Sequence, residues 1–431
     1  MKFINRESEK SALEEAIMLS SKKLYSIVIY GSRRVGKTRL ILEFLANNGL
    51  YFFVNKDKTS KSLLEEYEEN LRKKKTITEL ESLKNWDDFF KIIFERFKGA
   101  VVFDEFQNFI HVDKSIFGIL QKYIDLNEER KELLFIFSGS TIGLVKKLFL
   151  SSKEPLYGRV KRKLHIKPLS FFDSIKMCRE VNIQDLENII KVYSVFGGFP
   201  RYYVAIEDEN LHGKKFEDVI EKFFFVENSV FEDEVETILS MEFGRRSGIY
   251  YDILTAIANG CTRISDIASF LRKKETGITR QLNELVNYFE IVGMERQLLG
   301  NKRIMYIKHP LINFWFRFFY KSLSEYKKRD PYLLTKIKSE LNSYIGGGFE
   351  IICREEILPN LMPNKFIKIG KQWGKIPKTK EVYEIDIVGL NEKTKEILFC
   401  ECKWKEKVNA KRICKELIEN KIPYVDWNNE D

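Results

Sequence analysis

The feature that most constrains the fold of this chain is a short loop sequence, Gly-Ser-Arg-Arg-Val-Gly-Lys-Thr, at Gly31–Thr38. An apolar, β-branched run, Leu24–Tyr30, precedes it and an apolar-periodic stretch, Arg39–Leu45, follows, so the pattern predicts a buried strand, a tight loop and a helix. Such a loop surrounds a phosphate with backbone N–H groups at a helix N-terminus, where the helix dipole also favours negative charge. A chance glycine-rich turn is the alternative, but it does not account for the flanking strand and helix. The segment therefore predicts binding of a nucleoside triphosphate.

Individual loop residues have expected tasks in this chemistry. Gly31 and Gly36 permit the tight path of the backbone. Lys37 is expected to reach the β- and γ-phosphates as a catalytic group, and the hydroxyl of Thr38 is expected to ligate Mg²⁺. We expect nucleotide contacts from the whole loop and from the residue after it, namely Gly31, Ser32, Arg33, Arg34, Val35, Gly36, Lys37, Thr38 and Arg39.

Two carboxylates follow a second apolar run, Ala100–Phe103. Four apolar residues and then an aspartate form the pattern in which Asp104 holds Mg²⁺ beside a phosphate loop. Glu105 comes one residue later, where a general base could polarise the attacking water. Together with the loop, these residues predict hydrolysis of the bound nucleotide.

Two further polar residues follow as candidates for the same chemistry. Ser138 stands at the end of the apolar run Leu133–Phe137, where its hydroxyl is expected to sense the γ-phosphate or hold the attacking water; a plain helix cap is the alternative. Arg159, shortly before an expected strand at His165–Leu169, is a candidate finger for transition-state charge. The sequence leaves open whether Arg159 is instead a solvated surface residue, and whether it acts in its own subunit or in a neighbour's.

Strands and helices alternate through the first part of the chain, with a further strand expected at Gly49–Asn55 and a helical stretch from Ser60 to Lys98. This alternation predicts an α/β fold with a parallel sheet covered by helices on both faces. We expect a P-loop ATPase core at 1–170, a helical lid at 171–240, a winged helix at 241–325 and a further α/β domain at 326–431.

Taken together, the motifs resemble a family of archaeal P-loop ATPases that is related to the AAA+ and STAND classes. The residues that carry the resemblance are Phe3–Glu7, Gly31–Thr38, Asp104-Glu105, Ser138–Ser140 and Tyr157–Arg159. The resemblance implies ATP and Mg²⁺ as cofactors. The chain also lacks the Asn-Lys-x-Asp motif that recognises guanine.

The same resemblance places the Asn5-Arg6 segment near the adenine and the Gly197–Pro200 turn against the nucleotide from the side of the lid. Asn5, Arg6 and Pro200 are therefore implied nucleotide-binding residues, and Arg201 an implied second sensor. A Gly-Gly-x-Pro turn is also a good helix boundary, and this alternative stays open.

Three expected helices, Tyr251–Ala258, Ile264–Leu271 and Gly277–Phe289, precede a hairpin of Ile291–Arg296 and Arg303–Ile307. This order predicts a winged helix whose third helix contacts the major groove of DNA. The side chains expected at bases and phosphates are Thr279, Arg280, Gln281, Asn283, Lys273, Lys274, Arg296, Lys302 and Arg303. The alternative is a winged helix that packs on the nucleotide domain and relays its state without touching DNA.

Two carboxylates and a lysine mark the C-terminal region. Asp386 lies in an expected strand, Glu384–Val388, and Glu401 and Lys403 point the same way from a second, Ile397–Trp404. Carboxylates and an ammonium group on adjoining strands predict a site for a divalent metal beside a charge stabiliser.

An acidic residue also precedes these strands, since Glu350 stands on a helix expected to open at Gly348. The whole order resembles the D…E-x-K set of the restriction-endonuclease-like fold. The resemblance implies Asp386, Glu401 and Glu350 as metal ligands, and Asp386, Glu401 and Lys403 as catalytic groups, with Lys403 helping to form the nucleophile. The archaeal ATPases often carry such a domain, catalogued as one of unknown function. A surface ion pair of little energetic weight is the alternative.

Composition narrows the class of protein further. The net charge of +10 permits contact with nucleic acid, and 44% hydrophobic residues exclude a disordered chain. No apolar run is long enough to span a membrane, so we expect a cytoplasmic protein. The six cysteines form no Cys-x-x-Cys pair and there are four histidines, which argues against structural zinc. The sequence favours an ATPase coupled to a DNA-directed, metal-dependent nuclease-like domain, with DNA as partner. The alternative function is a nucleotide-dependent switch that binds DNA or protein without cleavage. The sequence leaves open whether the protein forms an oligomer.

Overall fold

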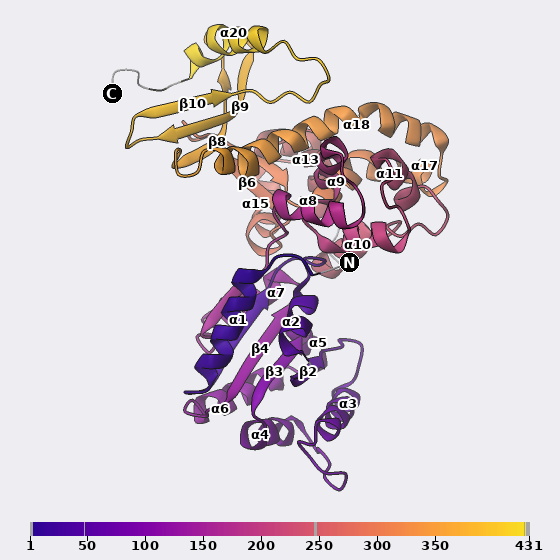
Figure 1. Ribbon diagram of the computed structural model, residues 1–431, viewed down its shortest axis with the longest axis vertical. Helices are drawn as coiled ribbons and strands as arrows, with labels where there is room; N and C mark the ends of the chain where they lie inside the picture. Colours follow the sequence, from indigo (N-terminus) through magenta and orange to yellow (C-terminus); the bar gives the residue numbers. More distant parts are fainter. Residues whose placement is uncertain (1–2, 47, 245–247, 426, 428–431) are drawn as a thin grey trace. The chain divides into compact units, whose positions relative to one another are not determined.

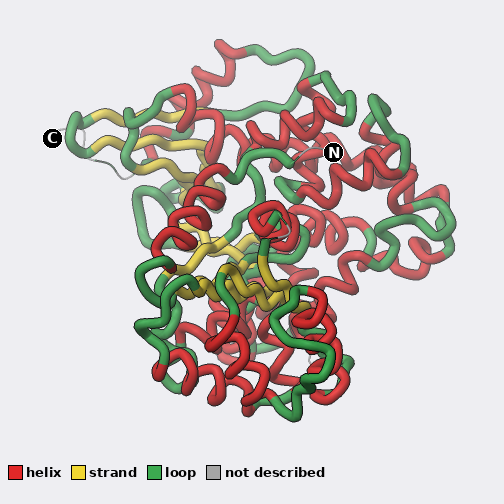
Figure 2. Tube along the Cα trace, turned by 60° about the horizontal axis from the view of Figure 1, so that its bottom comes forward, coloured by secondary structure: helices red, strands yellow, loops and turns green. Residues whose placement is uncertain are grey.

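The computed structural model describes residues 3–46, 48–244, 248–425 and 427. The chain divides into two compact units. The N-terminal unit comprises Phe3–Pro168 and Phe199–Arg201, and the C-terminal unit comprises Leu169–Gly198 and the chain from Tyr202 onward. Figure 2 shows that helices make up most of the chain and that the strands form separate groups. The finer division into four domains stays a prediction.

The N-terminal unit is built on a five-stranded parallel sheet in the order β2-β3-β4-β1-β5 (Figure 1). Its strands are β1 Tyr25–Tyr30, β2 Gly49–Phe53, β3 Gly99–Asp104, β4 Leu133–Gly139 and β5 Arg162–His165. Because β4 lies between β1 and β3, the predicted parallel α/β sheet is confirmed, with an added strand between the two motif-bearing strands. The carboxyl ends of β1, β3 and β4 therefore meet at one edge, where ligands bind in sheets of this kind.

Helices cover this sheet because its strands are apolar on both faces. Phe103 of β3 and Phe135 and Phe137 of β4 are fully buried in a cluster with side chains of the helices on one face. Each such burial contributes roughly 1.5–3 kcal/mol, so the strands hold the loops at their ends firmly. The helices are α1 Glu7–Ser20, α2 Lys37–Leu45, α3 Ser60–Lys73, α4 Trp86–Arg96, η1 Phe106–Asn108, α5 Phe109–Val112, α6 Ser115–Leu126 and α7 Ile142–Leu150.

Two sequence expectations for this unit were wrong in detail. The stretch Ser60–Lys98 is two helices, α3 and α4, because Asn85 caps α4 with its side chain and Lys75 adopts a left-handed backbone. The last strand is β5 at Arg162–His165, ahead of the expected His165–Leu169, because its register with β1 ends at Tyr30 and Pro168 has no backbone N–H to extend the ladder.

The C-terminal unit begins with a helical region and continues into three helices and a hairpin. The first helices are α8 Phe171–Glu180, α9 Leu186–Phe196, α10 Pro200–Asp208, α11 Phe216–Phe224 and α12 Glu234–Phe243, with the start of α10 in the N-terminal unit. We call residues 248–308 the helix–hairpin module. It contains α13 Gly248–Ala258, α14 Ile264–Phe270, η2 Glu275–Gly277, α15 Thr279–Asn283, the π-helical turn η3 Glu284–Tyr288, β6 Val292–Arg296 and β7 Arg303–Ile307.

The C-terminal part of the chain contains a separate antiparallel sheet, in the order β10-β9-β8 (Figure 1). Its strands are β8 Lys368–Lys375, β9 Val382–Asn391 and β10 Glu396–Cys400. The remaining helices are α16 Pro310–Phe318, η4 Tyr320–Ser322, α17 Leu323–Lys327, α18 Pro331–Ile352, η5 Cys353–Ile357, α19 Leu358–Leu361, α20 Ala410–Asn420 and η6 Ile422–Tyr424.

Two boundaries near the predicted metal site also differ from expectation. Helix α18 does not open at Gly348; it starts at Pro331 and carries Glu350 in its last turn. Its glycines permit close helix packing, since a Cβ on Gly348 would lie 2.4 Å from the Ser194 hydroxyl oxygen. Strand β10 ends at Cys400, so Glu401 and Lys403 lie just beyond the sheet instead of within the strand.

The tip of the β6–β7 hairpin is bound to the edge of the C-terminal sheet. The amide of Leu298 donates to the carbonyl of Lys371 at 3.2 Å. Gln372 accepts from the amide of Leu299 at 3.0 Å and donates to its carbonyl at 3.1 Å. These bonds fix strand β8 to the helix–hairpin module. Within the described ranges, no helix has the length and apolar character needed to cross a membrane.

Candidate functional site

The predicted phosphate loop joins β1 to α2, and its shape depends on two glycines. A Cβ on Gly31 would lie 2.2 Å from the carbonyl oxygen of Ile166, which leaves no room for any other residue. Gly36 has φ +92°, and Arg34 also adopts a left-handed φ of 69°. The backbone thus turns sharply into the first turn of α2, which begins at Lys37.

Lys37 closes the loop from inside. Its ammonium group donates to the carbonyl of Gly31 at 2.8 Å and to the carbonyl of Ser32 at 3.0 Å. The side chain is buried in spite of its charge. An ammonium group held inside the loop by its backbone carbonyls is the arrangement expected of a phosphate-binding lysine.

The two predicted magnesium ligands meet at the sheet edge. The hydroxyl of Thr38 donates to a carboxylate oxygen of Asp104 at 2.8 Å. Tyr51 of β2 donates to the same oxygen at 2.8 Å, a contact that the sequence analysis missed. Burial, and then the charge of Asp104, raises the pKa of the Tyr51 phenol, so it stays a donor. The signal was present only in the sheet order, which sets β2 beside β3.

Glu105 is held by three side chains. The hydroxyl of Ser140 donates to its carboxylate at 2.6 Å, Gln107 donates to the same group, and a guanidinium nitrogen of Arg33 lies 3.8 Å away. Glu105 itself has a left-handed φ of 54°, a strained conformation for a side chain of this kind. Ser138 is buried at the end of β4, and its hydroxyl has no hydrogen-bond partner among the described residues. The structure thus brings Ser140, which the sequence analysis did not single out, to the predicted base, and leaves Ser138 with an unused donor.

Arg6 ties the loop to the rest of the unit. Its guanidinium donates to the carbonyl of Val35 at 3.1 Å and to the carbonyl of Lys167 at 2.6 Å. Asn5 and Arg6 both have a positive φ, which sets a sharp turn before α1. These contacts give Arg6 a tethering role, and its implied contact with adenine stays a prediction.

Three other predicted residues have different surroundings. Pro200 lies against the loop, since its Cγ is 3.9 Å from the position of a Cβ on Gly36. Arg39 is exposed on α2 and pairs with Glu43 at 3.0 Å. Arg159 pairs with Asp125 at the end of α6 at 2.8 Å, so its guanidinium is committed to a surface ion pair of this chain.

The C-terminal residues Asp386, Glu401 and Lys403 also meet, although β10 stops short of the last two. The Lys403 ammonium lies 3.5 Å from Asp386 and 2.8 Å from Glu401. The backbone amide of Cys402 donates to the same oxygen of Asp386 at 2.8 Å. We call Glu350, Lys371, Glu384, Asp386, Glu401, Lys403 and Lys421 the carboxylate–lysine cluster.

Two lysines that no motif predicted complete this cluster. Lys421, after α20, donates to Glu401 at 2.6 Å and to the carbonyl of Glu384 at 2.7 Å. Lys371 of β8 lies 3.4 Å from Glu350 and also pairs with Glu384. Each carboxylate of the cluster therefore has an ammonium partner.

Ionisation in the cluster follows from these contacts. Burial alone would lower the pKa of Lys403, but its hydrogen bond to Glu401 and the charge of Asp386 raise it overall. The pKa of Lys371 is also raised, because Glu384 and Glu350 outweigh its burial. Burial, and then the nearby charge of Asp386, raises the pKa of Glu350. Over the part of the chain that the structure describes, no three His, Cys, Asp or Glu side chains are arranged to hold a metal ion by themselves.

The N-terminal sheet and its loop define a class of protein. Three features are those of a P-loop ATPase: a parallel sheet with an added strand, a phosphate loop whose turns are made by glycines, and an aspartate that is hydrogen-bonded to the loop threonine. Residues 3–206 match a family described as an ATPase domain predominantly from Archaea. Residues 315–413 match a second family, described as archaeal and bacterial proteins of unknown function. Together the two matches cover most of the chain, and they agree with the resemblance that the sequence motifs indicated.

Relatives agree with this assignment. The chain is similar to the uncharacterized protein MJECL04 of Methanocaldococcus jannaschii, with 29% identity over 94% of this chain and 88% of that protein. Its fold is similar to a Walker-type ATPase of Pyrococcus abyssi, with 23% identity, a TM-score of 0.57, and coverage of 73% of this chain and 96% of the other. The ORC2 protein of Aeropyrum pernix, seen with ADPNP and ADP, has 14% identity and a TM-score of 0.51 over 78% and 96% of the two chains.

Proposed function

We propose that this protein hydrolyses ATP with Mg²⁺ at the phosphate loop and uses the event to control a DNA-directed, metal-dependent phosphodiesterase in its C-terminal domain. The observation that carries the first half is the hydrogen bond from Thr38 to Asp104. It sets a hydroxyl and a carboxylate side by side at the mouth of the loop, which are the ligands that Mg²⁺ takes beside a nucleotide.

The residues present fit such a ligand. Gly31 and Gly36 make a loop that a Cβ would fill or strain, and the buried, unused hydroxyl of Ser138 lies at the end of the strand beside Asp104. Bound Mg²⁺ would offset charge on the phosphate oxygens. Lys37 would bind the phosphates, and Glu105, oriented by Ser140, would accept a proton from the attacking water. Arg159 would act on a neighbouring subunit only if an assembly separates it from Asp125.

The second half rests on the meeting of Asp386, Glu401 and Lys403. Mg²⁺ is commonly bound by one or two carboxylates together with substrate phosphates, so Asp386 and Glu401 suffice as protein ligands without a third. Glu350 lies close enough to Asp386 to have its pKa raised by it, and is the candidate for a supporting carboxylate. Because the pKa of Lys403 is raised, we assign it the task of stabilising charge on the scissile phosphate as an ammonium group.

The pairing of every cluster carboxylate with a lysine also favours the alternative function. A cluster in which each carboxylate already has an ammonium partner needs no metal, and a domain of this fold then serves as a binding platform. In that case the protein is a nucleotide-dependent switch that holds DNA or a protein partner without cutting it.

DNA cleavage by the full chain distinguishes these functions. Plasmid and linear DNA are incubated with Mg²⁺ or Mn²⁺, with and without ATP, using the wild type, Asp386→Ala and Lys37→Ala. We expect cutting by the wild type, loss of cutting in Asp386→Ala, and altered ATP dependence in Lys37→Ala. The matched control is Glu392→Ala, which removes an exposed carboxylate between β9 and β10 whose partner, Lys368, lies outside the cluster.

Each result has a clear meaning. Equal cutting by the wild type and by Asp386→Ala would contradict the nuclease assignment. ATP hydrolysis without cutting under any metal condition would favour the switch. Absence of ATP hydrolysis by the pure wild type would contradict the first half of the proposal.

A further inference from the structure

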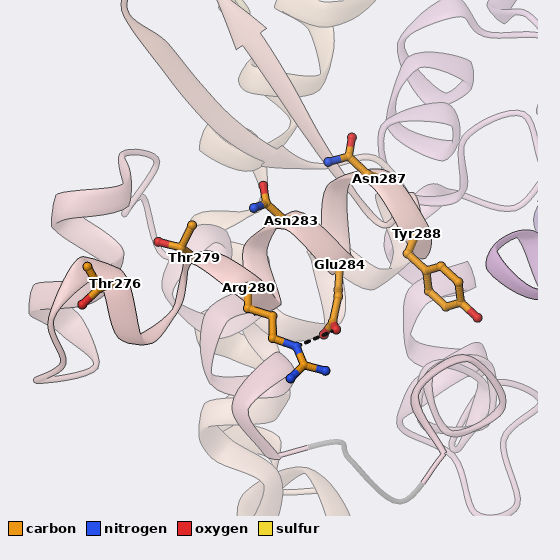
Figure 3. A pocket seen from close by; sticks show the side chains of 7 residues that line it. All are labelled: Thr276, Thr279, Arg280, Asn283, Glu284, Asn287 and Tyr288. Atoms are coloured by element: carbon orange, nitrogen blue, oxygen red, sulfur yellow. Dashed lines mark hydrogen bonds and ion pairs between the residues drawn. The ribbon is translucent and has the colours of Figure 1, made fainter. Parts of the chain in front are cut away.

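The helix α15–η3 in the helix–hairpin module has one buried face and one polar face. Ile278, Leu282 and Leu285 are buried, with the spacing of neighbours on one side of a helix. The other side carries short hydroxyl and amide side chains and one guanidinium. They are Thr279, Arg280, Asn283 and Asn287, which line an open hollow of about 570 Å³ together with Thr276 of η2, Glu284 and Tyr288 (Figure 3). We call this side the polar face.

Arg280 is held at this face by a short chain of contacts. Its side chain is 73% exposed and pairs with Glu284, one turn on, at 3.1 Å (Figure 3). Glu284 in turn accepts a hydrogen bond from Tyr250 of α13. An exposed pair of this kind contributes little to stability, so a stronger anion can take Arg280 from Glu284 at little cost.

The surroundings of the polar face carry more positive than negative charge, even with the exposed Asp266 and Glu275 counted. Arg263 precedes α14, and the turn after α14 contains Arg272, Lys273 and Lys274, all of them exposed. None of these four forms an ion pair within the described ranges of the chain. Each of them is therefore available to an anion outside the chain.

We infer that the polar face is a binding surface for double-stranded DNA, with Arg280 moving from Glu284 to the DNA when the duplex is bound. The inference rests on the proposed function and deepens it by naming the duplex form of the DNA and the surface that holds it. Amide side chains spaced one turn apart can each bond the edge of a base in the major groove, adenine above all, and guanidinium groups bond guanine or phosphate. The cations around the face supply the contacts to phosphate.

Other partners fit this face less well. Double-stranded RNA has a major groove too narrow for a helix to enter. The centres of protein interfaces are rich in aromatic and aliphatic residues, whereas six of the seven side chains that line the hollow are neither, Tyr288 being the exception. Glu284 makes the surface selective, because it competes for Arg280 whenever the DNA contact is poor.

Fluorescence anisotropy with a labelled DNA duplex tests this inference on the full chain, in EDTA and without ATP, so that neither cleavage nor nucleotide state contributes. We expect Arg280→Ala to weaken duplex binding about tenfold and to lower the slope of log K against log salt by about one. Asn283→Ala with Asn287→Ala weakens binding further. Glu284→Gln, which frees Arg280, tightens it a few-fold.

Lys336→Ala is the matched control, because Lys336 is exposed on α18 and makes no ion pair in the described part of the chain. We expect it to bind DNA within twofold of the wild type. Circular dichroism of each variant checks that it folds like the wild type. Equal affinity of Arg280→Ala and Lys336→Ala, no duplex binding at low salt, or equal binding of single-stranded DNA and double-stranded RNA would overturn the inference. Asp386→Ala keeps duplex binding whether or not the cleavage proposal holds, so the two can fail separately.

Discussion

At the phosphate loop, Asp104 accepts hydrogen bonds from two neutral hydroxyls, those of Thr38 and Tyr51. In the carboxylate–lysine cluster, Glu401 lies between two ammonium groups, 2.8 Å from Lys403 and 2.6 Å from Lys421. Both sites were predicted to hold a divalent metal from carboxylates on expected strands, at the end of the strand for Asp104 and within the strands for Asp386 and Glu401. Their surroundings balance charge in different ways.

The difference concerns what a metal ion must displace. A hydroxyl bonded to Asp104 can rotate and offer its oxygen as a further ligand, so the negative charge of the aspartate stays available. An ammonium group on Glu401 already neutralises that charge, and a cation can bind only by pushing it away against its Coulomb attraction. We expect tight, ordinary Mg²⁺ binding with nucleotide at the first site and weaker, lysine-limited binding at the second.

The largest effect is expected from the loop lysine. Lys37→Met removes the cation that binds the phosphates, and ATP hydrolysis should fall by about 10²–10³-fold. Phosphate release measures it. The control is Lys61→Met, which removes an exposed cation of α3 that pairs with Glu65 at 3.9 Å and should stay within twofold of the wild type. Equal loss of ATP hydrolysis in both variants would contradict the phosphate-binding role of Lys37.

The next effect concerns the predicted base. Glu105→Gln should lower ATP hydrolysis about 100-fold while nucleotide binding is kept, because the amide cannot accept the proton. Ser140→Ala should lower it about tenfold, since Ser140 orients Glu105 at 2.6 Å. Ser138→Ala is the comparison. If it costs more than Ser140→Ala, the sensor is Ser138, as the sequence predicted.

A smaller effect should appear at the second site when one ammonium is removed. Lys421→Met frees an oxygen of Glu401, and Mn²⁺ affinity should rise about three- to tenfold. Calorimetric titration measures it, with Asp104→Asn in every protein so that the loop site does not contribute. Lys368→Met is the control, because Lys368 pairs with Glu392 outside the cluster. Unchanged affinity would show that Lys421 does not compete with metal.

The smallest effect is a pH dependence of stability at Glu350. Its pKa is raised in the folded chain, by burial first and then by Asp386, so the folded state keeps a proton that the unfolded state has lost. Its contribution to stability is therefore present below the ordinary pKa of glutamate and is lost as the pH rises through the raised value. Glu350→Gln should remove this fall.

Thermal unfolding across that pH range measures the effect. From the low to the high end of the range, Tm should fall by about 1–2 °C more in the wild type than in Glu350→Gln. Other acidic groups with raised pKa are present in both proteins and cancel. Glu392→Gln, at an exposed carboxylate, should leave the slope unchanged. A steeper fall in Glu350→Gln would contradict the assigned sign.

Much of the N-terminal site could be predicted because its signals are local. The loop glycines, Lys37 and Thr38 are consecutive, and a strand before them and a helix after them fix where they lie. The confirmed parallel sheet followed from the alternation of apolar runs with helical stretches. Two strands of the C-terminal sheet, β9 and β10, were also predicted, although β10 ends at Cys400, before Glu401 and Lys403. Strand β8 was not predicted, because Lys368–Lys375 contains few apolar residues.

The sequence by itself determined the phosphate loop, the acidic end of β3 and the sheet class, since each depends on neighbours in the chain. Only the tertiary structure decided which hydroxyl reaches Glu105, that Tyr51 bonds Asp104, and that Lys371 and Lys421 neutralise the second set of carboxylates. These contacts join residues from different strands and helices, and they exist because sheet order and helix packing bring distant segments together. A motif records the residue types that a site needs, and the fold decides which charges surround them.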